Sequence, residues 1–200
     1  MLDTKRYLFK GLEKKIGIIF SSLPFTPNHY TIASIFFALG SFYFLINQEL
    51  ILTIIFFLIA GFLDFVDGSV ARYKGLESKI GAYLDTIVDR YVENFLLIGM
   101  LFLPLPEIFL SAKIWIALII FGSLMTTYSK AAAKEKELTD QELKGGLFSR
   151  GERIIFLLLS LVLGVIDASF IWTTYLLILI AFLTNITALQ RINSAIQKNR

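Results

Sequence analysis

The 200-residue chain is predicted to be an all-α integral membrane protein, with six transmembrane helices and an N-terminal juxtamembrane helix on the membrane surface. Three observations predict this class. Hydrophobic residues make up 56% of the chain, whereas soluble domains contain about 45–50%. The mean hydropathy is +0.71. Six apolar runs have about the 20-residue length that a helix needs to cross the hydrocarbon core of a bilayer.

The first expected element is an amphipathic helix over residues 4–20. Its lysines alternate with apolar residues such as Leu12 and Ile16, a combination that is typical of helices lying in the membrane interface. A solvated basic leader is the alternative, but the apolar residues cluster. The N-terminal stretch of residues 1–20 is not expected to be a signal peptide, because it carries acids, its apolar part is short and no small-residue cleavage site follows it.

The six spans follow in order along the chain. They are expected at about 29–47, 50–71, 80–103, 112–133, 152–167 and 170–190. Thr26 and Pro27 suit the start of the first of these helices, with Thr as the cap and Pro in the first turn. Short polar or proline-bearing segments separate the runs, and we find no internal repeat.

Basic residues predict the orientation of the spans. Lysine and arginine gather before the first span and after the second, fourth and sixth spans, whereas only Lys113 falls on the opposite side. Cytoplasmic segments carry the excess of such residues. The chain is therefore expected in the cytoplasmic membrane, with both termini and the polar ends of the second and third spans on the cytoplasmic side.

Two helices are expected to present four carboxylates at this side. Asp64 and Asp67 are three residues apart and share a helix face, and Gly81, Asp85 and Asp89 follow one another at four-residue steps. Clustered carboxylates near a membrane repel one another and are costly to desolvate. Divalent cations such as Mg2+ or Mn2+ remove this cost and bind oxygen ligands. The chain has no cysteine and a single histidine, which excludes thiol ligands and a histidine-based site.

The same two helices carry a motif that resembles the signature of the CDP-alcohol phosphotransferase family. The motif reads Asp64-x-x-Asp67-Gly68-x-x-Ala71-Arg72, then eight residues, then Gly81-x-x-x-Asp85-x-x-x-Asp89. Every fixed position matches. The likeness extends over nearly the whole chain, so residues 1–200 are expected to form a single domain of this family. Among its members, the sequence looks nearest to phosphatidylinositol phosphate and archaetidylinositol phosphate synthases.

The resemblance implies an activity and roles for the motif residues. Members transfer a phosphoalcohol from a CDP-linked donor to an acceptor hydroxyl and release CMP, here in phospholipid biosynthesis. Asp64, Asp67 and Asp85 would bind two divalent ions, and Asp89 would complete the site and act as the general base. Donor-binding roles would fall to Gly68, Ala71, Arg72, Gly81, Asn28 and Thr31. For Asn28 and Thr31, a plain helix start with polar caps explains the pattern equally well.

Arg150 and Arg153 are the candidates for binding the acceptor. They are three residues apart at the start of the fifth span, where two guanidinium groups could hold a phosphate bidentately. An Arg-x-x-Arg pair at this place resembles relatives that accept inositol phosphate. Lys130 keeps the first position of a basic pair that is usual in those relatives, but Ala132 occupies the second. Glycerol phosphate or another phosphorylated polyol therefore stays open as the acceptor.

Other expectations concern partners and a competing class. The donor is expected to carry diacyl or archaeal ether chains, the enzyme to form a homodimer as relatives commonly do, and nucleic acid to play no part. Glu93 could bind an acceptor hydroxyl or form a structural network with Arg90 and Asn94. An ion-coupled transporter is the competing class, because intramembrane acids also mark ion pathways. The absence of an inverted repeat disfavours it.

Overall fold

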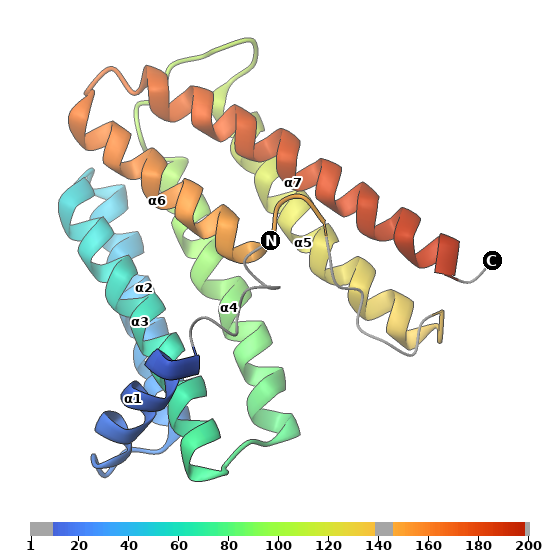
Figure 1. Ribbon diagram of the computed structural model, residues 1–200. Helices are drawn as coiled ribbons and strands as arrows, with labels where there is room; N and C mark the ends of the chain where they lie inside the picture. The colour runs from blue at the N-terminus through green and yellow to red at the C-terminus, as the bar shows by residue number, and fades with distance from the viewer. Residues whose placement is uncertain (1–9, 139–145, 199–200) are drawn as a thin grey trace. The chain divides into compact units, whose positions relative to one another are not determined.

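The computed structural model describes residues 10–138 and 146–198, and these residues form seven α-helices (Figure 1). The helices are α1 (Lys10–Ser21), α2 (Pro27–Ile46), α3 (Leu50–Lys74), α4 (Lys79–Met100), α5 (Ala112–Glu135), α6 (Arg150–Ile166) and α7 (Ile171–Lys198). The prediction of an all-helical chain is therefore confirmed for the described residues. The predicted juxtamembrane helix corresponds to α1, and residues 4–9 of that prediction lie outside the described part.

Among the helices of residues 10–138 and 146–198, four are long and apolar enough to cross a membrane, namely α2, α3, α5 and α7. The other two predicted spans also form helices, but each has a feature that makes it a weaker candidate. Helix α4 carries several charged side chains, among them Asp85 and Asp89, and α6 has only 17 residues. The helix bounds lie within about three residues of the predicted spans, except that α7 continues eight residues beyond residue 190.

Local sequence signals determine where several helices begin. Thr26 precedes α2 as predicted, and Pro27 is its first residue. His29 completes a capping box, because its Nδ1 lies 3.0 Å from the backbone nitrogen of Thr26. A capping box satisfies backbone groups that would otherwise have no partner at a helix start. Ser149 and Glu152 form the corresponding box at the start of α6.

The described helices form two compact units, with the boundary between Leu103 and Pro104. In the first unit α2 packs along α3 and also contacts α4, while α1 packs against α3 (Figure 1). Ser41 of α2 donates a 3.0 Å hydrogen bond to the backbone oxygen of Thr53 in α3, and both side chains are buried. Such contacts hold apolar helices together where burial of hydrocarbon alone gives little preference.

Helix α1 is joined to the first unit by an aromatic cluster. Phe20 lies edge-on to Tyr30 of α2 and Phe62 of α3, with ring centroids 6.0 and 5.7 Å away. Its backbone oxygen accepts a hydrogen bond from the Tyr30 hydroxyl at 3.1 Å. Ile16 and Phe20 also pack against the buried side chains of Val66 and Val70. Helix α1 is therefore packed into the helical unit through its apolar face.

In the second unit α7 packs along α5 and α6. Each pair is joined by a polar side chain. Asn185 donates a 3.0 Å hydrogen bond to the backbone oxygen of Leu118 in α5, and Thr173 donates one of 2.9 Å to that of Ser160 in α6. Arg191 adds a third contact, from Nη1 to the backbone oxygen of Thr126 at 2.8 Å.

Candidate active site

The two halves of the acidic motif stand at the end of α3 and the start of α4. Helix α3 ends at Gly75, which has a left-handed conformation with φ 64°; glycine adopts this helix-ending conformation without strain. Helix α4 begins shortly afterwards, where the Ser78 hydroxyl accepts a 3.0 Å hydrogen bond from the Gly81 nitrogen. This short connection places the aspartates of α3 and α4 near one another.

Three of the four aspartates form a compact carboxylate cluster. Asp64, Asp67 and Asp85 each offer an oxygen atom, and these atoms lie within 4.8 Å of one another. The Asp67 side chain is buried, and Asp64 and Asp85 are half-buried. Asp89 is one turn beyond Asp85 on α4 and lies outside this three-residue group, so its role as a metal ligand stays a prediction.

Thr31 of α2 reaches the carboxylate cluster. Its hydroxyl donates a 2.5 Å hydrogen bond to Oδ2 of Asp67. A buried carboxylate needs such partners, because the charge loses its hydration on burial. The motif places Thr31 among the candidates for the site, and the structure brings it there. Asn28, three residues earlier on the same helix, is exposed.

The cluster has the chemistry of a divalent-cation site. Its ligand atoms are carboxylate oxygens alone, which suits hard ions such as Mg2+ or Mn2+ better than softer transition metals. Three acids this close would repel one another without a cation. The residues present therefore fit the metal that the sequence motif implies.

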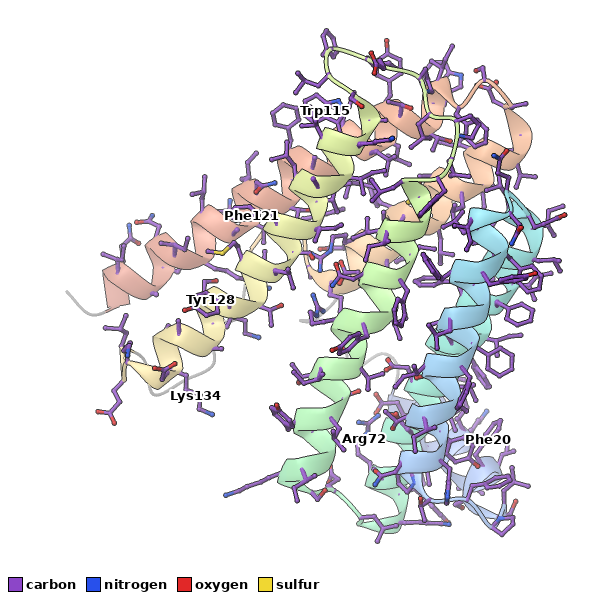
Figure 2. All side chains as sticks on the ribbon, turned by 180° about the vertical axis from the view of Figure 1, so that it is seen from behind. Phe20, Arg72, Trp115, Phe121, Tyr128 and Lys134 are labelled. Atoms are coloured by element: carbon purple, nitrogen blue, oxygen red, sulfur yellow. The ribbon has the colours of Figure 1, made fainter. Side chains whose placement is uncertain are left out.

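Arg72 and Gly68 stand side by side next to the cluster. A Cβ atom on Gly68 would lie 3.1 Å from Nη1 of Arg72, so the guanidinium group covers the glycine backbone. The guanidinium also forms a 3.4 Å ion pair with Glu13 of α1. Figure 2 shows Arg72 on the same end of the first unit as Phe20 of α1. Glu13 was not recognised from the sequence, although a lone acid among lysines could have drawn attention to it.

Glu93, on the same stripe as Asp89, is paired with a neighbour. Its carboxylate is fully buried and lies 3.0 Å from Nη1 of Arg90, and Asn94 donates a 2.8 Å hydrogen bond to the backbone oxygen of Arg90. These contacts favour the structural network over acceptor binding, the other role considered for Glu93.

The predicted acceptor residues belong to the second unit. Arg150 is the first residue of α6 and is half-buried, and Arg153, one turn later, is only 1% exposed. Lys130, on α5, is half-buried. A fully buried arginine is rare and is normally paired, so Arg153 belongs to a polar interior and not to a solvated basic rim.

A short segment before α6 is fastened to α7. The backbone nitrogens of Leu147 and Phe148 donate 3.0 Å hydrogen bonds to the side-chain oxygens of Gln190 and Thr187. Gly146 has φ 112°, and a Cβ atom there would lie 2.5 Å from Cγ2 of Thr187. These contacts hold the segment that leads into α6 against α7. Neither Thr187 nor Gln190 was singled out from the sequence, because nothing local marks a long-range partner.

Residues 25–187 match the family model of the CDP-alcohol phosphatidyltransferases. The chain belongs to this family. It is therefore a transferase of phosphate-containing groups in phospholipid synthesis, as the motif predicted. The chain is 32% identical over 198 residues to the archaetidylinositol phosphate synthase of Pyrococcus horikoshii, covering 98% of this chain and 96% of the relative. It is 31% identical over 189 residues to a bifunctional IPC transferase and DIPP synthase of Aquifex aeolicus, which covers 90% of this chain and 42% of that longer relative.

Solved structures show the same fold as this CDP-alcohol phosphatidyltransferase. The phosphatidylinositol phosphate synthase of Mycobacterium tuberculosis with CDP-DAG bound aligns with a TM-score of 0.79 at 21% identity, covering 92% of each chain. The same enzyme in complex with manganese and citrate aligns with a TM-score of 0.77 at 22% identity, covering 92% of this chain and 88% of the other.

Proposed function

We propose that this enzyme transfers a phosphatidyl or archaetidyl group from a CDP-linked lipid to a hydroxyl of inositol phosphate and releases CMP. The observation that carries the proposal is the cluster of Asp64, Asp67 and Asp85 within 4.8 Å, at the positions that the family motif assigns to metal binding. The name of the Pyrococcus horikoshii relative, which this chain matches along its length, supports the choice of inositol phosphate.

In this proposal the aspartates would hold two divalent ions, Mg2+ or Mn2+, with Asp89 completing the set. When bound, such ions neutralise the charge that develops on the donor diphosphate. Gly81 leaves room for the cytidine. Gly68 lets the Arg72 guanidinium lie against the helix backbone, from where it donates hydrogen bonds to a diphosphate oxygen.

Asp89 would act as the general base. Its carboxylate accepts the proton of the acceptor hydroxyl as that oxygen attacks the lipid-bearing phosphorus of the donor. The bond between this phosphorus and the bridging oxygen then breaks, and CMP leaves with that oxygen. One phosphoester bond forms and one phosphoanhydride bond is lost, so the reaction needs no other reactant.

Arg150 and Arg153 would bind the phosphate of the acceptor, with Lys130 contributing a further positive charge. A phosphomonoester carries nearly two negative charges at neutral pH, which suits a pair of guanidinium groups. Ala132 stands where inositol-phosphate relatives usually have a second basic residue. This departure is the specific observation that favours glycerol phosphate as the second candidate acceptor.

We further propose six spans, counting α4 and α6 with the four strongly apolar helices, with both termini and the active site facing the cytoplasm. The excess of lysine and arginine in alternate connections supports this orientation. A homodimer in the membrane is proposed from the resemblance alone.

Substrate turnover tests the proposed function directly. Purified protein is incubated with CDP-diacylglycerol or its archaeal ether equivalent in Mn2+, with inositol phosphate, glycerol phosphate, free inositol or serine as the acceptor. Release of CMP with inositol phosphate, abolished by chelation and restored by Mn2+, is expected. Turnover with glycerol phosphate alone would favour the second candidate, and faster turnover with free inositol or serine would contradict the phosphate-binding role of the arginines.

A further inference from the structure

We infer that Glu13 of α1 is a positioning residue of the donor site, which holds the Arg72 guanidinium in place for the CDP diphosphate. The inference rests on the proposed function, because it takes Arg72 to be a ligand of the donor. It assigns a role in the active site to a helix that the sequence marked only as a surface element.

The ion pair is the first observation. Nη2 of Arg72 lies 3.4 Å from Oε1 of Glu13, and the Glu13 side chain is only 14% exposed. The neighbouring Lys14 and Lys15 are exposed, so α1 turns Glu13 towards α3 and leaves these two lysines outside the contact. A carboxylate on a surface helix has no need to be buried unless it meets a partner there.

The docking of α1 is the second observation. One turn after Glu13, Gly17 approaches α3 so closely that a Cβ atom would lie 2.8 Å from the backbone oxygen of Ser69 and 2.9 Å from Cβ of Tyr73. Ile16 and Phe20 pack into the core around Tyr30, Val66 and Val70. These contacts fix α1 against α3. The position of the Glu13 carboxylate next to Arg72 is therefore fixed as well.

The third observation is the state of the guanidinium itself. Its atoms cover Gly68, because a Cβ on that glycine would lie 3.1 and 3.2 Å from Nη1 and Nη2. Within the described residues, Nε of Arg72 is buried and donates to no acceptor. A guanidinium has five N–H donors in a rigid fork. Glu13 engages Nη2 on one side of that fork, which leaves the buried Nε as a donor already held in place for an anionic oxygen.

This arrangement has an energetic consequence. An arginine that is free to adopt many rotamers loses side-chain entropy when it binds a phosphate, whereas an arginine already held in place loses less. Loss of the Glu13 charge should therefore weaken donor binding without removing the donor contact itself. The effect of losing the Glu13 charge should depend on the presence of Arg72.

Isothermal titration with CDP in the presence of Mn2+, on the detergent-solubilised full chain, tests the inference. Glu13→Gln is nearly isosteric and is expected to weaken CDP binding about three- to tenfold, which is less than the loss of a direct charge-assisted contact with the ligand, because Arg72 itself still contacts the diphosphate. Lys14→Gln, the matched control on the same helix, should bind CDP like the wild type. The decisive measurement is the double-mutant cycle: in an Arg72→Ala background, Glu13→Gln should cause no further loss.

The possible outcomes separate the inference from the proposed function. Wild-type protein that fails to bind CDP would refute the proposed function, and the inference with it. If wild-type protein binds CDP but Glu13→Gln binds equally well or more tightly, only the inference fails. It also fails if the loss is the same with and without Arg72, since Glu13 would then act through the fold. Should Glu13→Gln not fold, Glu13→Asp, which keeps the charge, takes its place. The same double-mutant cycle with Arg72→Ala then decides whether its effect on CDP binding depends on Arg72.

Discussion

Buried carboxylates are expensive in a membrane protein, and Asp67 shows at the scale of one residue how this chain accommodates them. The side chain is only 6% exposed, receives a hydrogen bond from Thr31 and lies close to two other acids. Hydrogen bonding offsets part of the desolvation cost, but it does not offset the repulsion between like charges. A cation shared by the three carboxylates offsets both.

Neutralising one ligand should therefore disable the site. Asp67→Asn and Asp85→Asn are each expected to lower CMP release by about a hundredfold or more, because a lost charged ligand weakens both the ion and its hold on the diphosphate. Turnover is measured over a range of Mn2+ concentrations. Asp167→Asn is the control, since Asp167 lies in the turn between α6 and α7 and bonds to Ser169. Wild-type rates at low Mn2+ in either variant would refute the cluster as the metal site.

The hydrogen bond from Thr31 offers a subtler test. Thr31→Val removes the donor to Asp67 and keeps the shape, whereas Thr31→Ser keeps the hydroxyl. We expect the valine variant to require about three- to tenfold more Mn2+ for half-maximal turnover, as the loss of one intramolecular hydrogen bond worth about 0.5–1.5 kcal/mol implies, and the serine variant to resemble the wild type. Equal behaviour of the two variants would show that the hydroxyl does not orient the carboxylate.

At the scale of elements, close contacts between helices decide how the functional side chains are presented. Helix α1 meets α3 at Gly17, and the start of α6 is held by Thr187 and Gln190 of α7. In both places a backbone approaches its neighbour more closely than a larger residue would permit. The position of Glu13 and that of Arg150 depend on these contacts.

Gly17→Ala should loosen the docking of α1. The new methyl group would meet the backbone oxygen of Ser69 at 2.8 Å, and a backbone atom cannot move aside as a side-chain end can. We expect a loss of about 1–3 kcal/mol in unfolding free energy, as for other overpacked sites. Thermal unfolding in detergent measures it. Gly11→Ala on the same helix meets no atom within 4 Å and should leave the stability unchanged or slightly raised.

The first turn of α6 carries the prediction for the acceptor. Arg150→Ala and Arg153→Ala should each raise the acceptor KM about ten- to a hundredfold, the loss expected for a charge-assisted bond of about 1.5–3 kcal/mol, and leave the donor KM nearly unchanged. Arg153→Lys keeps the charge in this buried position but loses the planar fork of the guanidinium. Its acceptor KM should therefore lie between that of the wild type and that of Arg153→Ala. Equal rises in the acceptor KM and the donor KM would indicate that the substitution disturbs the structure and does not remove a specific contact with the acceptor.

At the scale of the whole molecule, the alternation of basic segments predicts how the chain crosses the membrane. Because the chain contains no cysteine, a single introduced cysteine is its only site for maleimide labelling. We expect a membrane-impermeant maleimide added outside intact cells to label Glu107→Cys and Ala168→Cys. Glu77→Cys and Lys136→Cys should be labelled only after the cells are opened. All four residues are exposed. Outside labelling of Glu77→Cys would contradict the proposed orientation.

The sequence by itself determined the all-helical class of the described chain and the three members of its carboxylate cluster. Apolar runs of spanning length predicted the helices, and the described bounds follow them closely, because helix formation and its ends depend on neighbouring residues. The spacing of Asp64, Asp67 and Asp85 predicted a shared face on each helix. The family and its transferase chemistry followed from the same residues and were confirmed.

Only the tertiary structure decided which distant side chains meet. The bond from Thr31 to Asp67, the ion pair of Glu13 with Arg72 and the fastening of Phe148 to Thr187 each join residues from different helices or segments. No local pattern encodes such pairs, because they arise when helices pack and small residues let backbones approach. In the sequence Glu13 is one acid among the lysines of the predicted surface helix, and its burial beside Arg72 is visible only in the structure, where α1 lies against α3.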